Sequence, residues 1–316
     1  MHIRKYIWGI CYGLILTVFT GYVLLDTFVI KRVYSVEPPE HSRIADTGTD
    51  IQGESTSMQE EADISTSNDE ADVPVITDCS YEDDNISIMV TEYREYNSAV
   101  YVADILVSSA EYLKTAFAEG AYGKNITEKT SVTANRNNAI LAINGDYYGT
   151  RESGYVLRNG IVYRNTSSGT REDLVIYADG SFAIITESEV SADELSANGA
   201  QQILSFGPAL VVDSCISVTK DEEVGKAMAS NPRTAIGIID ELHYVFVVSD
   251  GRTEESEGLS LYELAEFMQS IGVTTAYNLD GGGSSTMYFN GEVINKPTTG
   301  GRHIRERSVS DIVYIG

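Results

Sequence analysis

Four places in the chain put polar side chains next to an apolar run. They are Asn144 with Asp146, Arg233, Asp250 with Arg252, and Asp280. An apolar run that ends in polar residues is typical of a strand that carries part of a site on a rigid scaffold. Each place alone is also compatible with an ordinary turn or a surface charge. Together they predict one polar site assembled at the ends of several strands.

The stretch after the last of these runs is the most distinctive in the chain. Asp280 is followed by three glycines, Gly281 to Gly283, and then by Ser284 and Ser285. Consecutive glycines cost backbone entropy, so the loop is expected to need positive φ angles or a close backbone approach. A carboxylate beside exposed N–H groups and hydroxyls suits a polar, anionic or sugar substrate. A glycine-rich hairpin connection is the alternative interpretation.

The elements that would position these residues are mostly strands. Three Asn-Gly or Asp-Gly pairs predict hairpin turns at 159–160, 179–180 and 290–291. Ser260 and Glu263 fit a capping box for a helix that ends at Gly272, and Ser109–Ala118 is expected to form a short amphipathic helix. The predicted fold class is α+β, with a strand-rich mixed sheet core and a few helices.

The first 84 residues have a different character. Residues 1–5 form a short basic N-terminus. Residues 6–30 contain an uncharged run of twenty residues, Tyr6 to Leu25, and this run is long enough to span a bilayer. Because no A-x-A-like cleavage site follows, an uncleaved transmembrane signal anchor is favoured over a cleaved signal peptide. Residues 31–84 are expected to form an acidic, disordered linker, and residues 85–316 form the folded domain. The domain is placed outside the cytoplasm, attached to the cell membrane by a single pass.

Charge and cysteine usage exclude several classes of function. The net charge is −25, and residues 37–84 hold 15 acidic residues against one basic residue, a net of −14 that leaves −11 elsewhere. An acidic chain argues against a nucleic-acid partner. Three cysteines and four histidines without ligand spacing predict no zinc site and no other cofactor. A divalent cation near Asp250 or Asp280 stays open, as does pairing of Cys79 with Cys215.

Five motifs occur in an order that resembles the phosphodiester glycosidase family. They are Ala142–Tyr148 (AINGDYY), Phe206–Leu210 (FGPAL), Arg233–Gly237 (RTAIG), Asp250–Arg252 (DGR) and Asn278–Thr286 (NLDGGGSST). The resemblance covers about Ile86 to Gly316, and the first 85 residues lie outside it. It implies hydrolysis of the glycosidic C–O bond of a sugar-1-phosphodiester, and the anchor suggests a substrate in the cell envelope or an exopolysaccharide.

The resemblance also implies roles for residues at the site. Asp280, Asp146 and Asp250 are the candidate catalytic carboxylates, and which acts as acid, base or nucleophile stays open. Arginines suit the diester anion, and Tyr147 is expected either to stack on a sugar face or to pack in the core. The expected substrate-binding set is Asn144, Arg233, Arg252, Gly281, Gly282, Gly283, Ser284 and Ser285.

Two other functions remain compatible with the sequence. One is a non-catalytic polysaccharide-binding or envelope-assembly module with the same fold. The other is a serine hydrolase that uses Ser284 or Ser285, although neither lies in a G-x-S-x-G motif.

Overall fold

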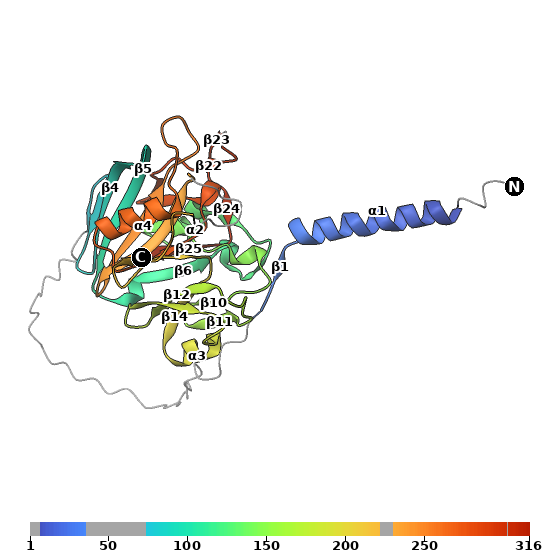
Figure 1. Cartoon of the computed structure of the whole chain (residues 1–316), viewed down its shortest axis with the longest axis horizontal. Helices are drawn as coiled ribbons and strands as arrows, with labels where there is room; N and C mark the ends of the chain where they lie inside the picture. Colours follow the sequence, from blue (N-terminus) through green and yellow to red (C-terminus); the bar gives the residue numbers. More distant parts are fainter. Residues whose placement is uncertain (1–6, 36–73, 222–229, 302) are drawn as a thin grey trace, which may run out of the picture.

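The computed structural model describes residues 7–35, 74–221, 230–301 and 303–316. Figure 1 shows a strand-rich domain from which one long helix, α1, projects. Most of the predicted linker, residues 36–73, lies outside the described residues. The α helices are α1 (Ile7–Phe28), α2 (Thr130–Arg136), α3 (Ala192–Ala197) and α4 (Leu261–Ser270).

A nine-stranded sheet forms the centre of the domain. Its strands, in spatial order, are β16 (Cys215–Ile216), β15 (Ala209–Val212), β19 (Thr275–Asn278), β17 (Arg233–Asp240), β18 (His243–Ser249), β5 (Ser98–Val107), β4 (Ile86–Glu95), β3 (Ser80–Glu82) and β2 (Val75–Ile76). The strands β2 and β3 fall in the region assigned to the linker from the sequence, so the large sheet begins ten residues before Asn85.

Two five-stranded sheets accompany the large sheet. One runs β21 (Glu292–Val293), β20 (Met287–Phe289), β9 (Leu141–Asn144), β25 (Asp311–Ile315) and β6 (Leu113–Phe117). The other runs β11 (Ile161–Arg164), β10 (Val156–Arg158), β14 (Ala200–Leu204), β12 (Glu172–Tyr177) and β13 (Phe182–Thr186). Short two-stranded pairs join β1 (Arg32–Val33) to β7 (Gly123–Lys124), β22 (Thr298–Thr299) to β23 (His303–Ile304), and β24 (Ser308–Val309) to β8 (Glu128–Lys129).

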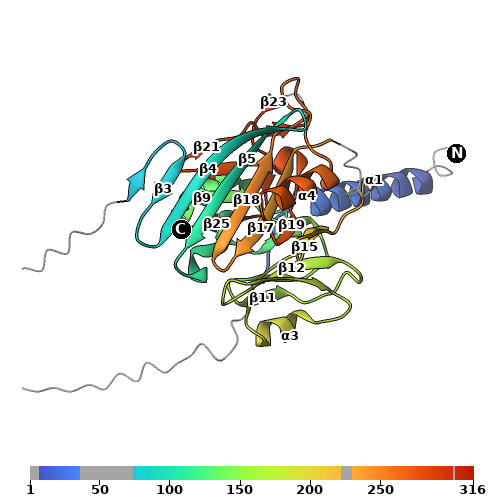
Figure 2. The ribbon, with the colours of Figure 1, turned by 60° about the vertical axis from the view of Figure 1, so that its left-hand side comes forward.

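Period-two alternation divides the apolar residues of the large sheet between two cores. On β18, Phe246 and Val248 face a core shared with both five-stranded sheets, while Val245 and Val247 face the core beneath α4. Figure 2 shows α4 lying across the large sheet. Its capping box is present as predicted, with Ser260 bonded to the Glu263 backbone and Glu263 bonded back.

The structure confirms the α+β class and the three predicted hairpins. Every named strand pair in the described ranges is antiparallel, whereas the sequence analysis expected a mixed sheet. The predicted helix Ser109–Ala118 is wrong. Only a short 3-10 turn, Ala110–Tyr112, forms there, and Leu113–Phe117 is strand β6 because it pairs along its whole length with β25.

Candidate active site

The glycine loop joins two different sheets, so the hairpin interpretation does not apply. It leaves the large sheet at the end of β19, forms a short 3-10 turn at Gly282–Ser284, and enters β20 of a five-stranded sheet. Backbone bonds fix its path: Leu279 N donates to Thr234 O (2.8 Å), and Gly282 N donates to Pro232 O (2.8 Å). The loop is therefore a rigid corner at the junction of two sheets.

Asn144, the last residue of β9, holds this corner in place through side-chain hydrogen bonds. Its Nδ2 donates to Asp280 O (2.6 Å), and its Oδ1 accepts from Thr234 Oγ1 (2.9 Å) and Thr286 N (3.2 Å). The side chain is fully buried. Asn144 thus positions the loop from behind.

The glycines are needed because two guanidinium groups lie against the loop. At Gly282, where φ is +64°, a Cβ would lie 2.9 Å from Arg252 Nη2. At Gly283 it would lie 2.8 Å from Arg307 Nη2. A side chain at either position would have to displace an arginine. This close approach is what the glycine run predicted.

A cavity of about 460 Å³ opens over the loop. It is lined by Tyr147, Arg151, Phe206, Arg233, Arg252, Asn278, Leu279, Asp280, Gly281, Gly282 and Arg307. Its charged groups are four arginines and one carboxylate, a local excess of three positive charges in a chain of net charge −25. Such a cavity attracts an anion.

Asp280 is the carboxylate of this cavity. Burial raises its pKa above the ordinary value, while the Ser284 hydroxyl and the guanidinium groups of Arg307 and Arg151 pull the pKa back down. A carboxylate with a raised pKa that stands in a cleft is a candidate acid, base or nucleophile.

The arginines are held to different degrees. Arg233 is buried, and its Nε donates to Leu259 O (2.8 Å). Arg252 donates twice to Asn231 Oδ1 (3.0 and 2.8 Å). Arg151 donates to Ser205 O (2.6 Å), and its guanidinium lies 5.1 Å from the centre of the Phe206 ring. Arg307 makes no hydrogen bond to the described residues.

Asp146, a second predicted acid, does not line the cavity. It is fully buried, and its Oδ2 accepts from Arg158 Nη2 (2.9 Å) and Ser205 N (2.8 Å). Arg158 also donates to Asp311 Oδ2 (2.7 Å). Burial alone would raise the pKa of Asp146, but Arg158 and the Ser205 N–H bring it below the ordinary value. Asp146 therefore lies in an internal ion pair behind the cavity.

Asp250, the third acid, also lies outside the cavity. It is 3% exposed, and its Oδ1 accepts from Asn295 Nδ2 (3.1 Å) and Lys296 N (2.9 Å). Burial raises the pKa of its carboxyl. This arrangement ties the turn after β21 to the end of β18.

Five residues of the predicted site line the cavity, and six do not. Asp280, Arg233, Arg252, Gly281 and Gly282 are brought together there. The rest stand behind or beside it: Asn144, Asp146, Asp250, Gly283, Ser284 and Ser285.

Sequence reasoning missed two of the four arginines that line the cavity, Arg151 and Arg307. Arg151 stands shortly after the Asn144–Tyr148 motif, and this nearness was the available signal. Tyr147, for which two roles were open, lines the cavity with 41% of its surface exposed. The structure thus places it where it can face a ligand.

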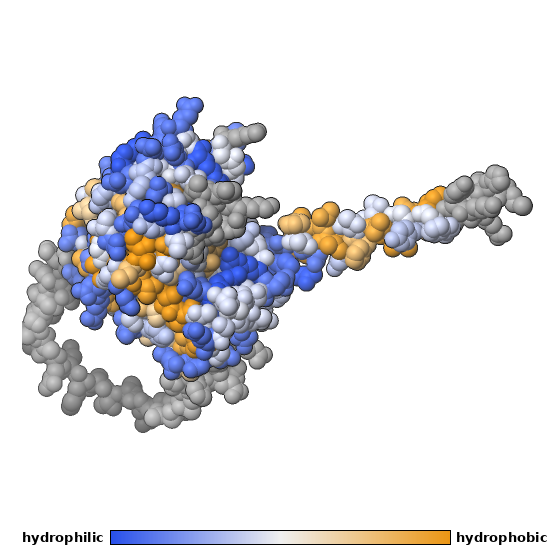
Figure 3. All heavy atoms as spheres, viewed as in Figure 1, coloured by the Kyte–Doolittle hydropathy of each residue, from blue (hydrophilic) through white to orange (hydrophobic). Residues whose placement is uncertain are grey.

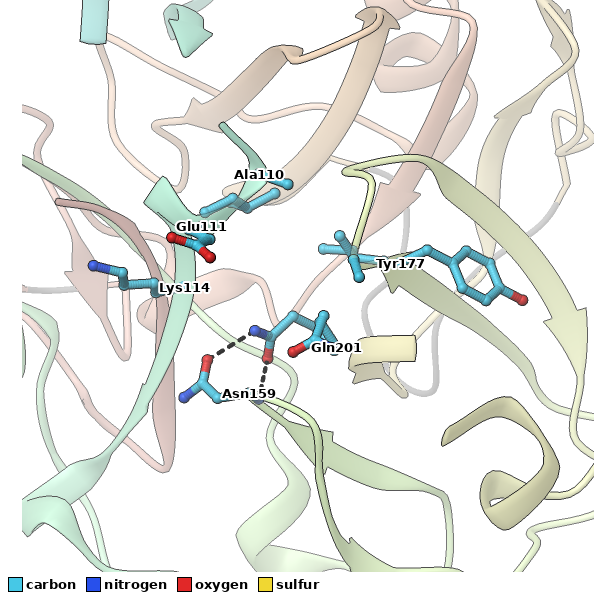
Figure 4. A pocket seen from close by; sticks show the side chains of 10 residues that line it. Ala110, Glu111, Lys114, Asn159, Tyr177 and Gln201 are labelled. Carbon is cyan, nitrogen blue, oxygen red and sulfur yellow. Dashed lines mark hydrogen bonds between the residues drawn. The ribbon is translucent and has the colours of Figure 1, made fainter. Parts of the chain in front are cut away.

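A second hollow of about 360 Å³ lies between β6, β12 and β14 (Figure 4). Asn159 and Gln202 lie on its wall, with Gln202 Nε2 donating to Asn159 Oδ1 (2.8 Å). Its charged side chains are Glu111 and Lys114, so it lacks the arginine cluster of the first cavity. No group of three or more His, Cys, Asp or Glu side chains suited to a metal ion occurs among the described residues.

The sequence model of the phosphodiester glycosidase family matches residues 137–316, a range that contains all the residues lining the cavity around Asp280. The chain is 30% identical over 201 residues to the SPbeta prophage-derived uncharacterized protein YomE of Bacillus subtilis (strain 168), covering 61% of this chain and 30% of YomE. It is 44% identical over 66 residues to the mouse N-acetylglucosamine-1-phosphodiester alpha-N-acetylglucosaminidase, covering 21% of this chain and 13% of that protein. The matched regions thus span less than a third of either relative.

Solved structures share the fold. The zebrafish N-acetylglucosamine-1-phosphodiester alpha-N-acetylglucosaminidase catalytic domain, auto-inhibited by its pro-peptide, superposes with a TM-score of 0.59 at 22% identity, over 73% of this chain and 82% of that one. A hypothetical protein from Synechocystis gives 0.54 at 13% identity, over 73% of this chain and 62% of that one. With the family match covering more than half of the sequence, the chain belongs to the phosphodiester glycosidase family.

Proposed function

We propose that this chain is a membrane-anchored hydrolase that cleaves the glycosidic bond of a sugar-1-phosphodiester in cell-envelope or exopolysaccharide metabolism. The observation that carries the proposal is the cavity in which four arginines surround a single carboxylate, Asp280. Family membership and the family's name support the same reaction class.

The arginines suit the phosphodiester. Arg307 and Arg252 lie against Gly283 and Gly282, where both guanidinium groups can donate to the non-bridging phosphate oxygens. This contact neutralises the anion and stabilises the charge that develops on the departing phosphate. Because a phosphate monoester is a good leaving group, its departure needs little help from a general acid.

The other walls suit the sugar. Tyr147 and Phe206 offer aromatic faces, and the Oδ1 of Asn278 is a buried acceptor without a hydrogen-bond partner among the described residues. A sugar hydroxyl can donate to it. Asp280 then faces the anomeric carbon.

The reaction uses one water and one carboxylate. The bond between the anomeric carbon and the phosphate oxygen breaks, and its electron pair leaves with the phosphate. Asp280, whose raised pKa makes it a better base than an ordinary aspartate, takes a proton from the attacking water, and the water oxygen forms the new bond to the anomeric carbon. The products are a free sugar and a phosphomonoester. Asp146 and Asp250 act on this site through the backbone that they hold.

The N-terminal helix supports the anchoring part of the proposal. Among the described residues, one helix, Trp8–Phe28, is long and apolar enough to cross a membrane, as an anchor or as a signal sequence. Figure 3 shows apolar surface along this helix, outside the folded domain. We place the catalytic domain on the extracytoplasmic side.

Asp280→Asn in the full chain tests the proposal. Release of free sugar from a synthetic glycosyl phosphodiester is expected to fall at least about 100-fold, the usual size of a lost general base. Asp250→Asn is the matched control, because its amide oxygen can still accept from Lys296 N outside the cavity. It is expected to keep turnover within a few-fold of the unmodified chain. Saccharide binding without turnover, unchanged in Asp280→Asn, would instead favour the non-catalytic module.

A further inference from the structure

The segment that follows α1 is attached to the folded domain. Strand β1 pairs with β7 in the register Arg32 with Lys124 and Val33 with Gly123. Tyr34 N extends the pairing by donating to Tyr122 O (2.9 Å). A Cβ at position 123 would collide with Arg32 O, so only glycine lets the two strands approach. We call residues 29–34 the juxtamembrane strap.

The end of α1 is held by the domain as well. The last carbonyls of a helix lack partners within the helix. Here the Asn125 side chain donates to Ile30 O (3.0 Å) and Asp26 O (3.3 Å), in effect capping α1 from the domain. Lys31 and Glu119 add an ion pair across the same junction.

Aromatic side chains also contact each other between the strap and the domain. The rings of Tyr34 and Tyr122 lie 5.8 Å apart. Both line a hollow of about 130 Å³ together with Arg151, and Arg151 also lines the cavity of Asp280. The hollow beside the strap and the candidate active site thus share one lining side chain, that of Arg151.

These contacts change the expected distance between membrane and domain. Three residues, 29–31, separate the end of α1 from β1, and three extended residues span only about 10 Å. A fully extended linker over 31–84 would instead reach up to about 180 Å. Residues 36–73 begin just after β1 and end just before β2, which both pair with strands of the domain. The length of this segment therefore does not set the distance to the membrane.

We propose that the juxtamembrane strap holds the catalytic domain directly on the bilayer, so that the enzyme meets its substrate at the membrane surface. Residues 29–31, between α1 and β1, then set the distance between the membrane and the domain. The proposal rests on the membrane anchoring proposed above, but its test does not depend on catalysis.

Disulfide trapping in membranes tests the docking. The full chain is made without its native thiols (Cys11→Ala, Cys79→Ser, Cys215→Ser), with a protease site inserted after Gly53. Arg32→Cys is then combined with Lys124→Cys, its cross-strand partner. After mild oxidation and cleavage at the inserted site, the two fragments are expected to run as one band on a non-reducing gel and to separate on reduction.

Arg32→Cys with Glu92→Cys is the matched control, since Glu92 is exposed on β4. A domain on a long tether would link both pairs to a similar, low extent, and equal yields would overturn the proposal. A mature chain that begins after Tyr34, found by mass spectrometry of the purified protein, would overturn it too. Cooperative thermal unfolding of each double variant shows that the gel compares folded proteins.

Discussion

Of the four arginines in the cavity, Arg307 is the one best placed to move onto a ligand. Arg233, Arg252 and Arg151 already donate to Leu259 O, Asn231 Oδ1 and Ser205 O. Arg307 makes no hydrogen bond to the described residues and lies beside Gly283. Its donors are free for an anion.

Arg307→Gln is therefore expected to raise KM for a glycosyl phosphodiester by about 10- to 100-fold, the value of a hydrogen bond to a charged group. Steady-state kinetics with and without the substitution provide the measurement. Arg305→Gln is the control, because Arg305 is exposed, lies two residues away and does not line the cavity. Equal effects of the two substitutions would show that general charge, and not position, matters.

Asp173 gives the domain a pH-dependent stability. It is fully buried in β12, and burial, followed by the charge of Glu187, raises its pKa to about 9. A pKa that is higher in the folded state means that the folded protein binds an extra proton between about pH 4 and pH 9. The stabilisation is complete below pH 4 and is lost as the pH rises to 9.

Asp173→Asn removes this titration. The variant is expected to gain unfolding free energy relative to the unmodified chain as the pH rises from 5 to 8, by on the order of 1 kcal/mol per pH unit. Urea denaturation at several pH values measures the change. Asp179→Asn, at an exposed turn where Ser181 lowers the pKa, should leave the slope in this range unchanged. If the unfolding free energies of Asp173→Asn and of the unmodified chain changed in parallel with pH, the assignment of the pH dependence to Asp173 would be contradicted.

Among the predicted acids, sequence reasoning found the residue types but could not separate their roles. Asp146, Asp250 and Asp280 each follow an apolar strand in the sequence. What distinguishes them is the partner that each meets in three dimensions. Arg158, the partner of Asp146, stands in a different sheet, and nothing in its local sequence marks it as buried.

At the scale of elements, the glycine loop is the part that depends most on backbone geometry. It carries Asp280 across from β19 to β20 and lets two arginines rest against its backbone. Its function is therefore sensitive to one added methyl group.

Gly283→Ala tests this sensitivity. The new Cβ would lie 2.8 Å from Arg307 Nη2 and 3.0 Å from its Cζ, so the guanidinium must shift. We expect kcat/KM to fall about 10-fold, as when one charge-assisted contact is lost, with the melting temperature nearly unchanged. Gly291→Ala is the contrasting variant: its φ of +98° makes alanine strained, but nothing lies within 4 Å. It should lower the melting temperature and keep activity.

Elements whose local signal specifies a turn or a helix start were predicted correctly, whereas one whose local helical signal is overridden by a distant strand was not. Asn159-Gly160 and Ser260 with Glu263 encode a turn and a helix start in a few neighbouring residues. Residues 113–117 also show apolar residues at helical spacing, but pairing with Asp311–Ile315, nearly 200 residues later, makes them a strand. Local propensity gave way to a long-range partner.

At the scale of the whole molecule, acidic and basic residues are concentrated in different parts of the chain. Residues 37–84 hold a net of −14, while the cavity concentrates four arginines in one place. The sequence predicted the first feature from composition. The second feature required the fold, because Arg151, Arg233, Arg252 and Arg307 come from distant segments.

The nine-stranded sheet has a consequence for how copies of this protein coexist. Its two outer strands, β16 and β2, are only two residues long. Open sheet edges template pairing with other chains, and very short edge strands are one way in which proteins limit it. Proteins concentrated on a surface meet one another often, and at these two outer strands of the large sheet a neighbouring copy finds only two residues to pair with.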